Sequence, residues 1–558
     1  MSQLSEIRRS TLRDVLILLL LSYFAFWWNL GKMGLIDPDE PFYALTAREM
    51  VQSGDWMTPQ IFGAPQFEKP ILYYWTVAAS FRAFGESEWA GRFSAALAAT
   101  ALVFLTYAFA RRLFNARAGL IAGAFMAGGV ELCLMGRLML TDIPLALFIT
   151  AALYCYWRAL EEPARRDRWV ILHFVCTGLA VLTKGPIGTL VPLFAALSFT
   201  WLGKRPWVFR GRGFWIGAGL HLLIVGPWYG LMLEQHCLRF IEEFFYRDNI
   251  LRFVQAEHPS NNHFWYYPGV LLIGSIPWLP AALLGLKKLC WKFRASPATL
   301  FCACWFLPNL LFVTLAQSKL PSYGFYLFVP LAVAIGAALD AVVARGFESA
   351  AERRVVLGAA ALQAVVPFAV PFVPLARGFS VGAVSFGLVL SVALVAFCLR
   401  RYRLWIAATA CATAVLLVGL VSYSFEPLDE TLSIRATALK MASQRHDGEP
   451  LLSGKFAMRG VAYYTHDSVS VLSQKASPFW AEHPVPILHL EDLPRLMEKY
   501  PSALCTMRQS EWRGFSSSEV FGASGGERIG ENILVRATRP ANPASMASDH
   551  PQPKGKSL

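Results

Sequence analysis

Charged residues are scarce in this chain. Asp, Glu, Lys and Arg make up 16% of its 558 residues, hydrophobic residues make up 55%, and the mean hydropathy is +0.42. A soluble globular protein of this length needs a larger charged fraction to cover its surface. A disordered chain has far fewer apolar residues. The composition excludes both classes and indicates a polytopic membrane protein.

The chain also lacks a cysteine framework. Eight of its ten cysteines lie in or beside apolar stretches, and only Cys237 and Cys505 have clearly polar surroundings. No pair of CxxC motifs occurs, and no internal repeat stands out. The cysteines therefore indicate neither a disulfide scaffold nor a zinc-ribbon site.

Thirteen apolar stretches are long enough to cross a bilayer about 30 Å thick. The first, roughly 12–30, ends in Trp27, Trp28 and Asn29 without a small-residue cleavage site, which predicts a retained anchor. The other stretches lie near 90–110, 117–136, 140–157, 169–183, 186–202, 213–233, 266–286, 298–316, 322–344, 353–374, 379–399 and 403–424.

Basic residues alternate along these stretches. Seven clusters occur, at 8–13, 111–117, 158–168, 204–212, 287–294, 345–354 and 400–403. The short connections between them hold one basic residue each, namely Arg137, Lys184, Lys319 and Arg377. By the positive-inside rule the clusters are cytoplasmic. The net charge of +13 then reflects topology and not nucleic-acid binding.

The composition changes near the C-terminus. From Glu426 the chain becomes polar, with expected strands at 460–472 and 532–536 and a short helix at 492–499. We expect a transmembrane domain over 1–425, with outer loops 32–89 and 234–265, and a small outer α/β domain over 426–558. A Pro/Ser/Lys-rich segment from about Arg539 is expected to be disordered.

An acidic motif, Asp-Pro-Asp-Glu at 37–40, begins the first outer loop. Three carboxylates in four residues repel one another unless a cation or a hydrogen-bond donor shares them. Asp37 and Pro38 also suit a helix start, and Glu40 favours its positive end. Capping accounts for one or two of these acids but not for all three, so the motif favours a functional role.

Asp142 is a second candidate, at the outer start of the stretch 140–157. It can cap that helix, since Pro144 suits an early helical position, or pair with Arg137. Function and structure are equally compatible with this residue alone. Because Asp39 and Asp142 are expected at exposed boundaries, their removal is expected to leave the fold intact.

Lys69, Lys184 and Lys319 are solitary lysines expected at one membrane level. Each can extend its amine toward the membrane surface or bind a lipid phosphate as a point charge. Three such lysines at one depth favour an anion site. The aromatic run at 73–75, close to Lys69, predicts a helix lying on the outer membrane surface.

Two histidines form a weaker signal. His258 and His263 lie in the second outer loop and, with Glu68, have the nitrogen and oxygen donors that zinc prefers. Their spacing is not that of a recognised zinc motif, and solvent-facing histidines explain them equally well. A divalent metal, zinc, is a hypothesis that rests on these three residues.

The chain resembles the bacterial dolichyl-phosphate-mannose-type glycosyltransferases, which are membrane enzymes of the C-type fold. Within them it is most similar to the aminoarabinose transferases of lipid A. The resemblance covers about 10–345. The motifs that carry it are 37–44 (Asp-Pro-Asp-Glu-Pro-Phe-Tyr-Ala), 47–50 (Ala-Arg-Glu-Met), 53–56 (Ser-Gly-Asp-Trp), 67–70 (Phe-Glu-Lys-Pro), 73–75 (Tyr-Tyr-Trp), 183–186 (Thr-Lys-Gly-Pro), 264–267 (Phe-Trp-Tyr-Tyr), 277–278 (Pro-Trp) and 318–321 (Ser-Lys-Leu-Pro).

The resemblance implies an inverting enzyme of the bacterial inner membrane, acting as a monomer. It implies transfer of 4-amino-4-deoxy-L-arabinose from undecaprenyl phosphate to lipid A phosphates at the periplasmic face. Asp39 and Asp142 match the family's acidic pair. The donor phosphate would bind Lys69, Lys319, Lys184 and Arg137, and the substrates would contact Glu40, Tyr43, Tyr323 and Tyr326. Transfer of another sugar, such as mannose or a uronic acid, to lipid or protein stays open. A transporter is disfavoured because the charges gather at one face.

Overall fold

The computed structural model describes residues 2–373, 378–423, 425–474, 484–515, 521 and 526–538. The segment from Arg539, expected to be disordered, and Arg377 lie outside these residues. The chain divides into two compact units. Unit 1 comprises Met1–Met33, Thr46–Ile61 and Pro65–Phe425, and unit 2 comprises Gly34–Leu45, Phe62–Ala64 and Glu426–Leu558.

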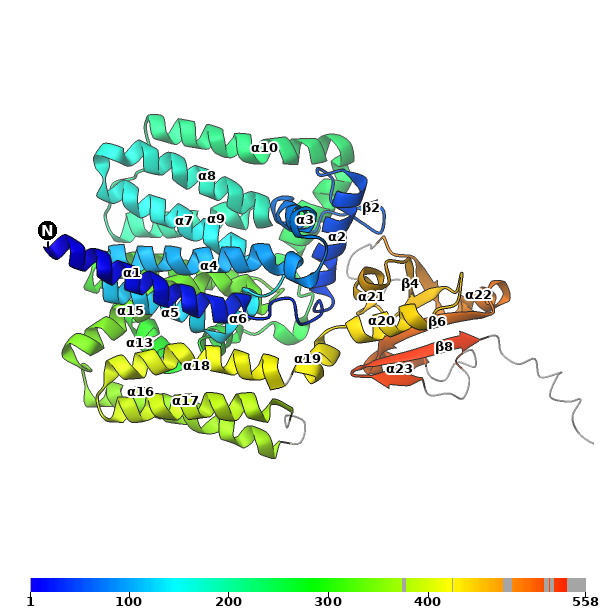
Figure 1. Cartoon of the computed structure of the whole chain (residues 1–558). Coiled ribbons are helices and arrows are strands. Elements are labelled where there is room, and N and C mark those ends of the chain that lie inside the picture. The colour runs from blue at the N-terminus through cyan, green and yellow to red at the C-terminus, as the bar shows by residue number, and fades with distance from the viewer. Residues whose placement is uncertain are drawn as a thin grey trace, which may run out of the picture. The chain divides into compact units, whose positions relative to one another are not determined.

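Unit 1 is a bundle of helices, which run side by side from α10 at one edge to α16 and α17 at the other (Figure 1). In chain order they are α1 (Ser2–Ser22), α3 (Leu72–Phe84), α4 (Glu88–Leu113), α5 (Ala116–Gly128), α6 (Val130–Met135), α7 (Asp142–Glu161), α8 (Arg166–Lys184), α9 (Ile187–Leu202), α10 (Arg212–Phe240), α11 (Arg252–Val254), α12 (Tyr266–Gly274), α13 (Leu279–Cys290), α14 (Pro297–Leu315), α15 (Phe328–Arg345), α16 (Ala350–Val365), α17 (Ser380–Cys398) and α18 (Tyr402–Tyr423). Helix α2 (Asp39–Ser53) begins in unit 2 and ends in unit 1, and β1 (Gln60–Ile61) pairs with β2 (Ala64–Pro65).

Nine segments among the described residues are long and apolar enough to span a membrane, and α5 and α9 are shorter apolar helices. A multi-pass helical membrane protein is thereby confirmed, whereas the number thirteen stays a prediction. The bundle packs through small residues. A Cβ atom on Gly336 of α15 would collide with the carbonyl oxygen of Ala118 in α5, so glycine allows these two helices to approach closely.

Two of the expected spans are broken helices. The stretch 117–136 divides into α5 and α6 at Gly129, and 266–286 divides into α12 and α13 before Trp278. The two breaks contact each other, because the amide of Val130 donates to the carbonyl of Ile276 at 2.8 Å. Glycine and proline weaken a helix, but hydropathy averaged over about 20 residues does not register them.

The aromatic run at 73–75 is helical, as expected, and two of its three rings are buried against protein. Tyr73 and Tyr74 are 1% and 0% exposed, and their helix α3 packs on α4 and α8. Aromatic residues next to a lysine have the same composition whether their rings face lipid or protein. Tyr73 and Tyr74 therefore do not face lipid, whereas a position of α3 on the outer membrane surface stays a prediction.

Unit 2 contains a six-stranded mixed sheet with the order β5-β4-β3-β6-β8-β7. Its strands are β3 (Leu451–Ser453), β4 (Val469–Ser473), β5 (Ile487–His489), β6 (Ser502–Arg508), β7 (Glu527–Ile529) and β8 (Asn532–Thr538). The first four in that order are parallel, and β8 is antiparallel to both of its neighbours. The helices are α19 (Phe425–Leu432), α20 (Arg435–Gln444), α21 (Met458–Thr465), α22 (Leu493–Lys499) and α23 (Gln509–Phe515).

A small C-terminal α/β region is confirmed, with one error in its elements, whereas its bounds 426–558 and its outer location stay predictions. The helix at 492–499 and the strand at 532–536 are present as α22 and β8. The expected strand 460–472 is instead helix α21 followed by β4. Because β3 and β4 are parallel, the chain must cross over between them, and α21 is that connection.

Candidate functional site

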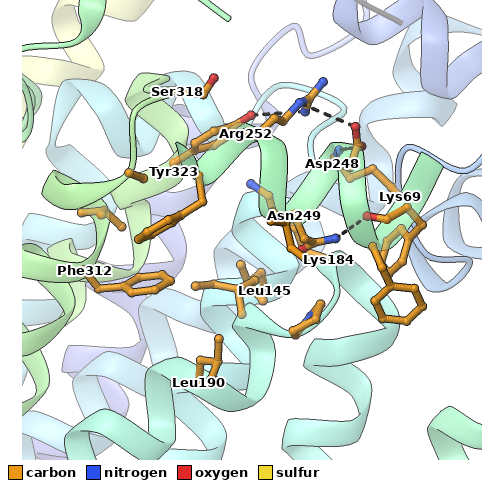
Figure 2. Close-up of a pocket in the computed structure, with 18 of the residues that line it drawn as sticks. Lys69, Leu145, Lys184, Leu190, Asp248, Asn249, Arg252, Phe312, Ser318 and Tyr323 are labelled. Carbon is orange, nitrogen blue, oxygen red and sulfur yellow. Dashed lines mark hydrogen bonds and ion pairs between the residues drawn. The ribbon is translucent and has the colours of Figure 1, made fainter. Parts of the chain in front are cut away.

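Unit 1 contains a cavity of about 510 Å³ with two different sides (Figure 2). Charged side chains gather on one side, and Leu145, Leu190 and Phe312 lie on the other. The charged residues that line the cavity are three cations and two carboxylates, Lys69, Lys184, Arg252, Glu68 and Asp248. The cavity thus offers cations beside an extended apolar surface.

Asp248 is shared by two of these cations. Its Oδ2 lies 3.3 Å from Lys69 Nζ, and its Oδ1 lies 3.6 Å from Arg252 Nε. Arg252 Nε also lies 3.4 Å from Glu257 Oε2. The Asp248 side chain is only 4% exposed, so its charge is compensated inside the protein.

Lys184, the last residue of α8, is held between a carboxylate and an aromatic ring. Its amine forms an ion pair with Asp142, the first residue of α7, and lies 4.6 Å from the centroid of the Tyr323 ring. Tyr323 and Tyr326 both line the cavity, from the turn Pro321–Leu327 before α15. Lys184, predicted to bind phosphate, and Asp142, predicted to be catalytic, are therefore in direct contact.

The structure corrects the expected environment of Asp142. The residue is 5% exposed instead of lying at an exposed boundary. Asp142 forms an ion pair with Lys184. Arg137 instead donates to the carbonyl oxygens of Ala25 and Trp28, at 3.3 and 2.8 Å.

The third lysine has different neighbours. Lys319 is 2% exposed and donates to Asn262 Oδ1 and to the carbonyl of Ala316, both at 2.6 Å. These bonds join the loop before α12 to the end of α14. Of the three predicted anion-binding lysines, the structure brings Lys69 and Lys184 to one cavity and places Lys319 in this loop contact.

Sequence reasoning missed Arg252, Asp248 and Asn249. Asp248 and Asn249 lie in the π-helical segment Ile241–Leu251, and Arg252 begins α11. The backbone turns sharply before them, at Cys237, which has a φ of 38°. Four charged residues within 243–252 were a visible signal, because they interrupt an otherwise aromatic and aliphatic run.

The residues proposed for zinc do not fit a metal site. Glu68 lines the cavity, while the His263 ring stacks on Trp265 with centroids 4.6 Å apart and planes inclined by 6°. Throughout the described part of the chain, no group of three or more His, Cys, Asp or Glu side chains is arranged to hold a metal. Glu68, His258 and His263 are therefore not brought together as three ligands.

The acidic motif at 37–40 lies in unit 2, where its members differ in environment. Asp37 is buried, and its Oδ2 accepts a 2.9 Å hydrogen bond from the amide of Ile434. Burial raises the pKa of Asp37 to about 8, although the Ile434 hydrogen bond and the charge of Arg508 lower it. Glu40 is 1% exposed and accepts from the amide of Ile36 at 2.8 Å. Asp39 begins α2 and is exposed, whereas Tyr43, on the same helix, is buried.

Known proteins resemble this chain in sequence and in fold. Residues 11–241 match the family model of dolichyl-phosphate-mannose-protein mannosyltransferases. The structure of ArnT from Cupriavidus metallidurans bound to undecaprenyl phosphate aligns with a TM-score of 0.76 at 21% identity, covering 94% of this chain and 97% of that one. The chain has the ArnT fold. The family resemblance and the fold class expected from the sequence are confirmed.

Relatives of this chain in sequence are named as arabinosyl transferases. An undecaprenyl phosphate-alpha-4-amino-4-deoxy-L-arabinose arabinosyl transferase 2 of Pseudomonas fluorescens is 32% identical over 372 residues, 64% of this chain and 62% of the relative. A transferase of the same name, without the number, from Edwardsiella ictaluri is 29% identical over 401 residues, 69% of this chain and 72% of the relative. For the first relatives the match spans 62% and 60% of their length.

Proposed function

We propose that this ArnT-like protein is a membrane glycosyltransferase. It moves 4-amino-4-deoxy-L-arabinose from undecaprenyl phosphate to a phosphate group of lipid A. The observation that carries the proposal is the two-sided cavity of unit 1, in which Lys69, Lys184 and Arg252 lie beside an apolar surface. A polyprenyl phosphate has the matching chemistry, because its phosphate needs cations and its isoprenoid chain needs an apolar wall.

The reaction is a single displacement at the anomeric carbon. A lipid A phosphate oxygen forms a bond to that carbon while the bond to the undecaprenyl phosphate oxygen breaks, and the configuration inverts. Undecaprenyl phosphate leaves as a phosphate monoester anion with the bonding electron pair. Lys69 and Arg252 stabilise this developing charge, since fixed cations in a partly dry site need no reorganisation.

The acidic residues act on the sugar and the acceptor. The phosphate nucleophile is already largely ionised at neutral pH, so a strong general base is not needed. In the proposal Asp39 and Asp142 orient the acceptor and the sugar's amino group and stabilise oxocarbenium character. The Asp142–Lys184 pair couples one of these acids to the cations of the cavity. Tyr323 and Tyr326 supply aromatic surface for the donor, and Glu40 and Tyr43 support Asp39 on α2.

The proposed orientation places this chemistry at the periplasmic face of the bacterial inner membrane. It rests on the seven basic clusters, which the positive-inside rule assigns to the cytoplasm. Alkaline phosphatase fused after Phe425 is then active, and a cytoplasmic reporter fused at the same position is inactive. The reverse result contradicts the orientation. A monomer is part of the proposal, and light scattering of the purified protein tests it.

Zinc has no step in this reaction, because Glu68, His258 and His263 do not fit a three-ligand site. Metal analysis of the purified protein and of Glu68→Gln tests that reading. Stoichiometric zinc that disappears in Glu68→Gln would contradict it.

The function is tested on lipid A itself. Cells with the protein are expected to show lipid A heavier by one or two aminoarabinose groups, and cells without it are not, as read by mass spectrometry. An added hexose or uronic acid would instead identify a transferase of another sugar. A glycosylated protein with unchanged lipid A would identify a protein glycosyltransferase.

A further inference from the structure

Four successive backbone amides before α2, from Gly34 to Asp37, each donate a hydrogen bond. Gly34 donates to Asp429 Oδ1 at 2.7 Å, and Leu35 donates to the Tyr464 hydroxyl at 2.7 Å. Ile36 donates to the carboxylate of Glu40, and Asp37 donates to the carbonyl of Leu432 at 3.1 Å. Loop amides commonly bond to water, so four satisfied amides in succession mark a segment with a defined position.

The C-terminal part of unit 2 supplies three of these four acceptors. Asp429 lies on α19, Leu432 ends that helix, and Tyr464 lies on α21. The bond in the other direction, from the Ile434 amide to Asp37, closes a reciprocal pair with the bond from Asp37 to Leu432. Asp429 is itself oriented by Arg435, whose guanidinium lies 2.6 Å from the other carboxylate oxygen.

Two glycines allow the segment to lie against this domain. A Cβ atom on Gly460 of α21 would collide with Asp37 Oδ1, and one on Gly34 would collide with Ser433 Oγ. Arg459, next to Gly460, lies over the Phe42 ring at 4.6 Å and donates to the carbonyl of Pro38 at 3.5 Å. The segment thus has close steric contacts as well as hydrogen bonds.

We propose that the C-terminal α/β domain is a positioning element of the transfer reaction, in which Asp429 and Tyr464 hold the backbone of 34–37 and so set the position of Asp39. This inference rests on the proposed function for the role of Asp39. Asp39 begins α2 two residues after the held segment, so a shift of that segment moves the carboxylate. A displacement of about 1 Å at a reacting group lowers the rate by about 100-fold.

The first experiment measures the holding without activity. Tyr464→Phe removes the hydroxyl that accepts the Leu35 amide, and Tyr500→Phe is the control, because Tyr500 is another half-buried tyrosine of the same domain. Hydrogen–deuterium exchange of the full chain is expected to be faster in the peptide containing 34–37 only in Tyr464→Phe. Equal exchange in wild type and Tyr464→Phe overturns the proposed holding.

The second experiment measures transfer from synthetic undecaprenyl-phosphate aminoarabinose to purified lipid A in liposomes. Losing one hydrogen bond in Tyr464→Phe is expected to lower kcat of the folded protein by about 3- to 10-fold, with KM for the donor unchanged. Asp429→Ala is expected to do the same, while Asp429→Asn, which keeps an oxygen acceptor, recovers most of kcat. If Tyr464 and Asp429 have only a structural role, these variants lower Tm and the amount of folded protein but leave kcat of the folded protein unchanged.

A third variant displaces the segment without removing a bond. Gly460→Ala is expected to lower kcat by about 10- to 100-fold through the collision with Asp37. Gly358→Ala is the matched control, because a Cβ atom there meets nothing within 4 Å. Altered exchange with wild-type kcat in both Tyr464→Phe and Gly460→Ala overturns the positioning role. If the wild-type protein shows no transfer, the proposed function is contradicted. The exchange experiment then still tests whether Tyr464 holds the backbone of 34–37.

Discussion

The cavity of unit 1 and the surroundings of the segment 34–37 in unit 2 both contain several carboxyl groups, but these groups have different partners. In the cavity, carboxylates pair with side-chain cations, as Asp248 does with Lys69 and Asp142 with Lys184. In the segment, they accept backbone amides, as Asp37 does from Ile434. One region contains carboxylates paired with cations, and the other contains carboxyl groups bonded to the main chain.

This difference separates a binding region from a holding region. A ligand phosphate that enters the cavity can take over Lys69 as a partner, because one anion replaces another at the same cation. An amide that loses its carboxylate acceptor inside the protein has no such replacement, and the unpaired group costs about 1–3 kcal/mol. The cavity is therefore suited to exchange of partners, and the segment 34–37 is suited to a permanent position.

The largest expected effect comes from the exposed acid of the motif. Asp39→Ala is expected to lower transfer by about 100-fold or more, because the group that orients the reactants is lost. Since Asp39 is exposed, the yield and Tm of the purified protein should match wild type. Asp447→Ala, at another exposed aspartate of unit 2, is the control in the liposome assay. Transfer near the wild-type rate in Asp39→Ala would remove this residue from the mechanism.

Asp142 is expected to combine a loss of activity with a loss of stability. Asp142→Ala leaves the Lys184 charge unpaired and nearly buried, which costs about 3–5 kcal/mol. The double variant Asp142→Ala/Lys184→Met is expected to recover Tm but not transfer. Recovery of both would show that Asp142 only neutralises Lys184, and loss of neither in Asp142→Ala would contradict the pair itself.

Lys69 tests the exchange of partners in the cavity. Lys69→Ala is expected to weaken use of the donor by about 10- to 100-fold at limiting concentration, because a charge-assisted contact to the phosphate contributes about 1.5–3 kcal/mol. Lys292→Ala is the control, since Lys292 forms an ion pair with Glu348 beside a different cavity. Steady-state kinetics against donor concentration decide the point. An unchanged KM and kcat/KM would exclude Lys69 as a phosphate ligand.

The smallest expected effect concerns stability and pH in the holding region. The pKa of Asp37 is raised from 3.8 to about 8 in the folded protein, with Arg508 and Glu40 as the charged groups facing it. The folded state then binds the proton more tightly than the unfolded state. The stability from this group is full below pH about 4 and is lost as pH rises toward 8.

Asp37→Asn removes this titration while keeping the amide acceptor for Ile434. Between pH 5 and 8, about the range in which the group titrates, Tm of wild type is expected to fall relative to Tm of Asp37→Asn. Parallel curves for the two proteins would show that Asp37 does not titrate in this range.

Local patterns predicted most of the helices but not their breaks. The apolar stretches near 298–316, 379–399 and 403–424 became α14, α17 and α18 within a few residues. Such a stretch has few alternatives to a helix, because lipid offers no partner for a bare peptide group. The break between α12 and α13 and the crossover helix α21 depend on contacts with residues distant in the chain. Local composition does not indicate those contacts.

Local sequence context predicted only part of the candidate site, because it does not give the distant partners of each charged residue. Lys69 and Lys184 stood out because an isolated charge in an apolar context is costly, and both line the cavity. Lys319 has the same local context but a neutral partner, Asn262, which is 57 residues away. Arg252 did not stand out as an isolated charge, because three other charged residues lie within 243–252, although that charged run was itself a signal.

Membrane character, the positions of most long helices and a C-terminal α/β region were determined by the sequence alone, since each depends on residues that are near neighbours in the chain. The partners of the charged groups were decided only by the tertiary structure. Asp248 meets Lys69 across 179 residues, and Ile434 meets Asp37 across 397. The free energy of such a pair depends on distance and burial, and both quantities exist only once the chain has folded.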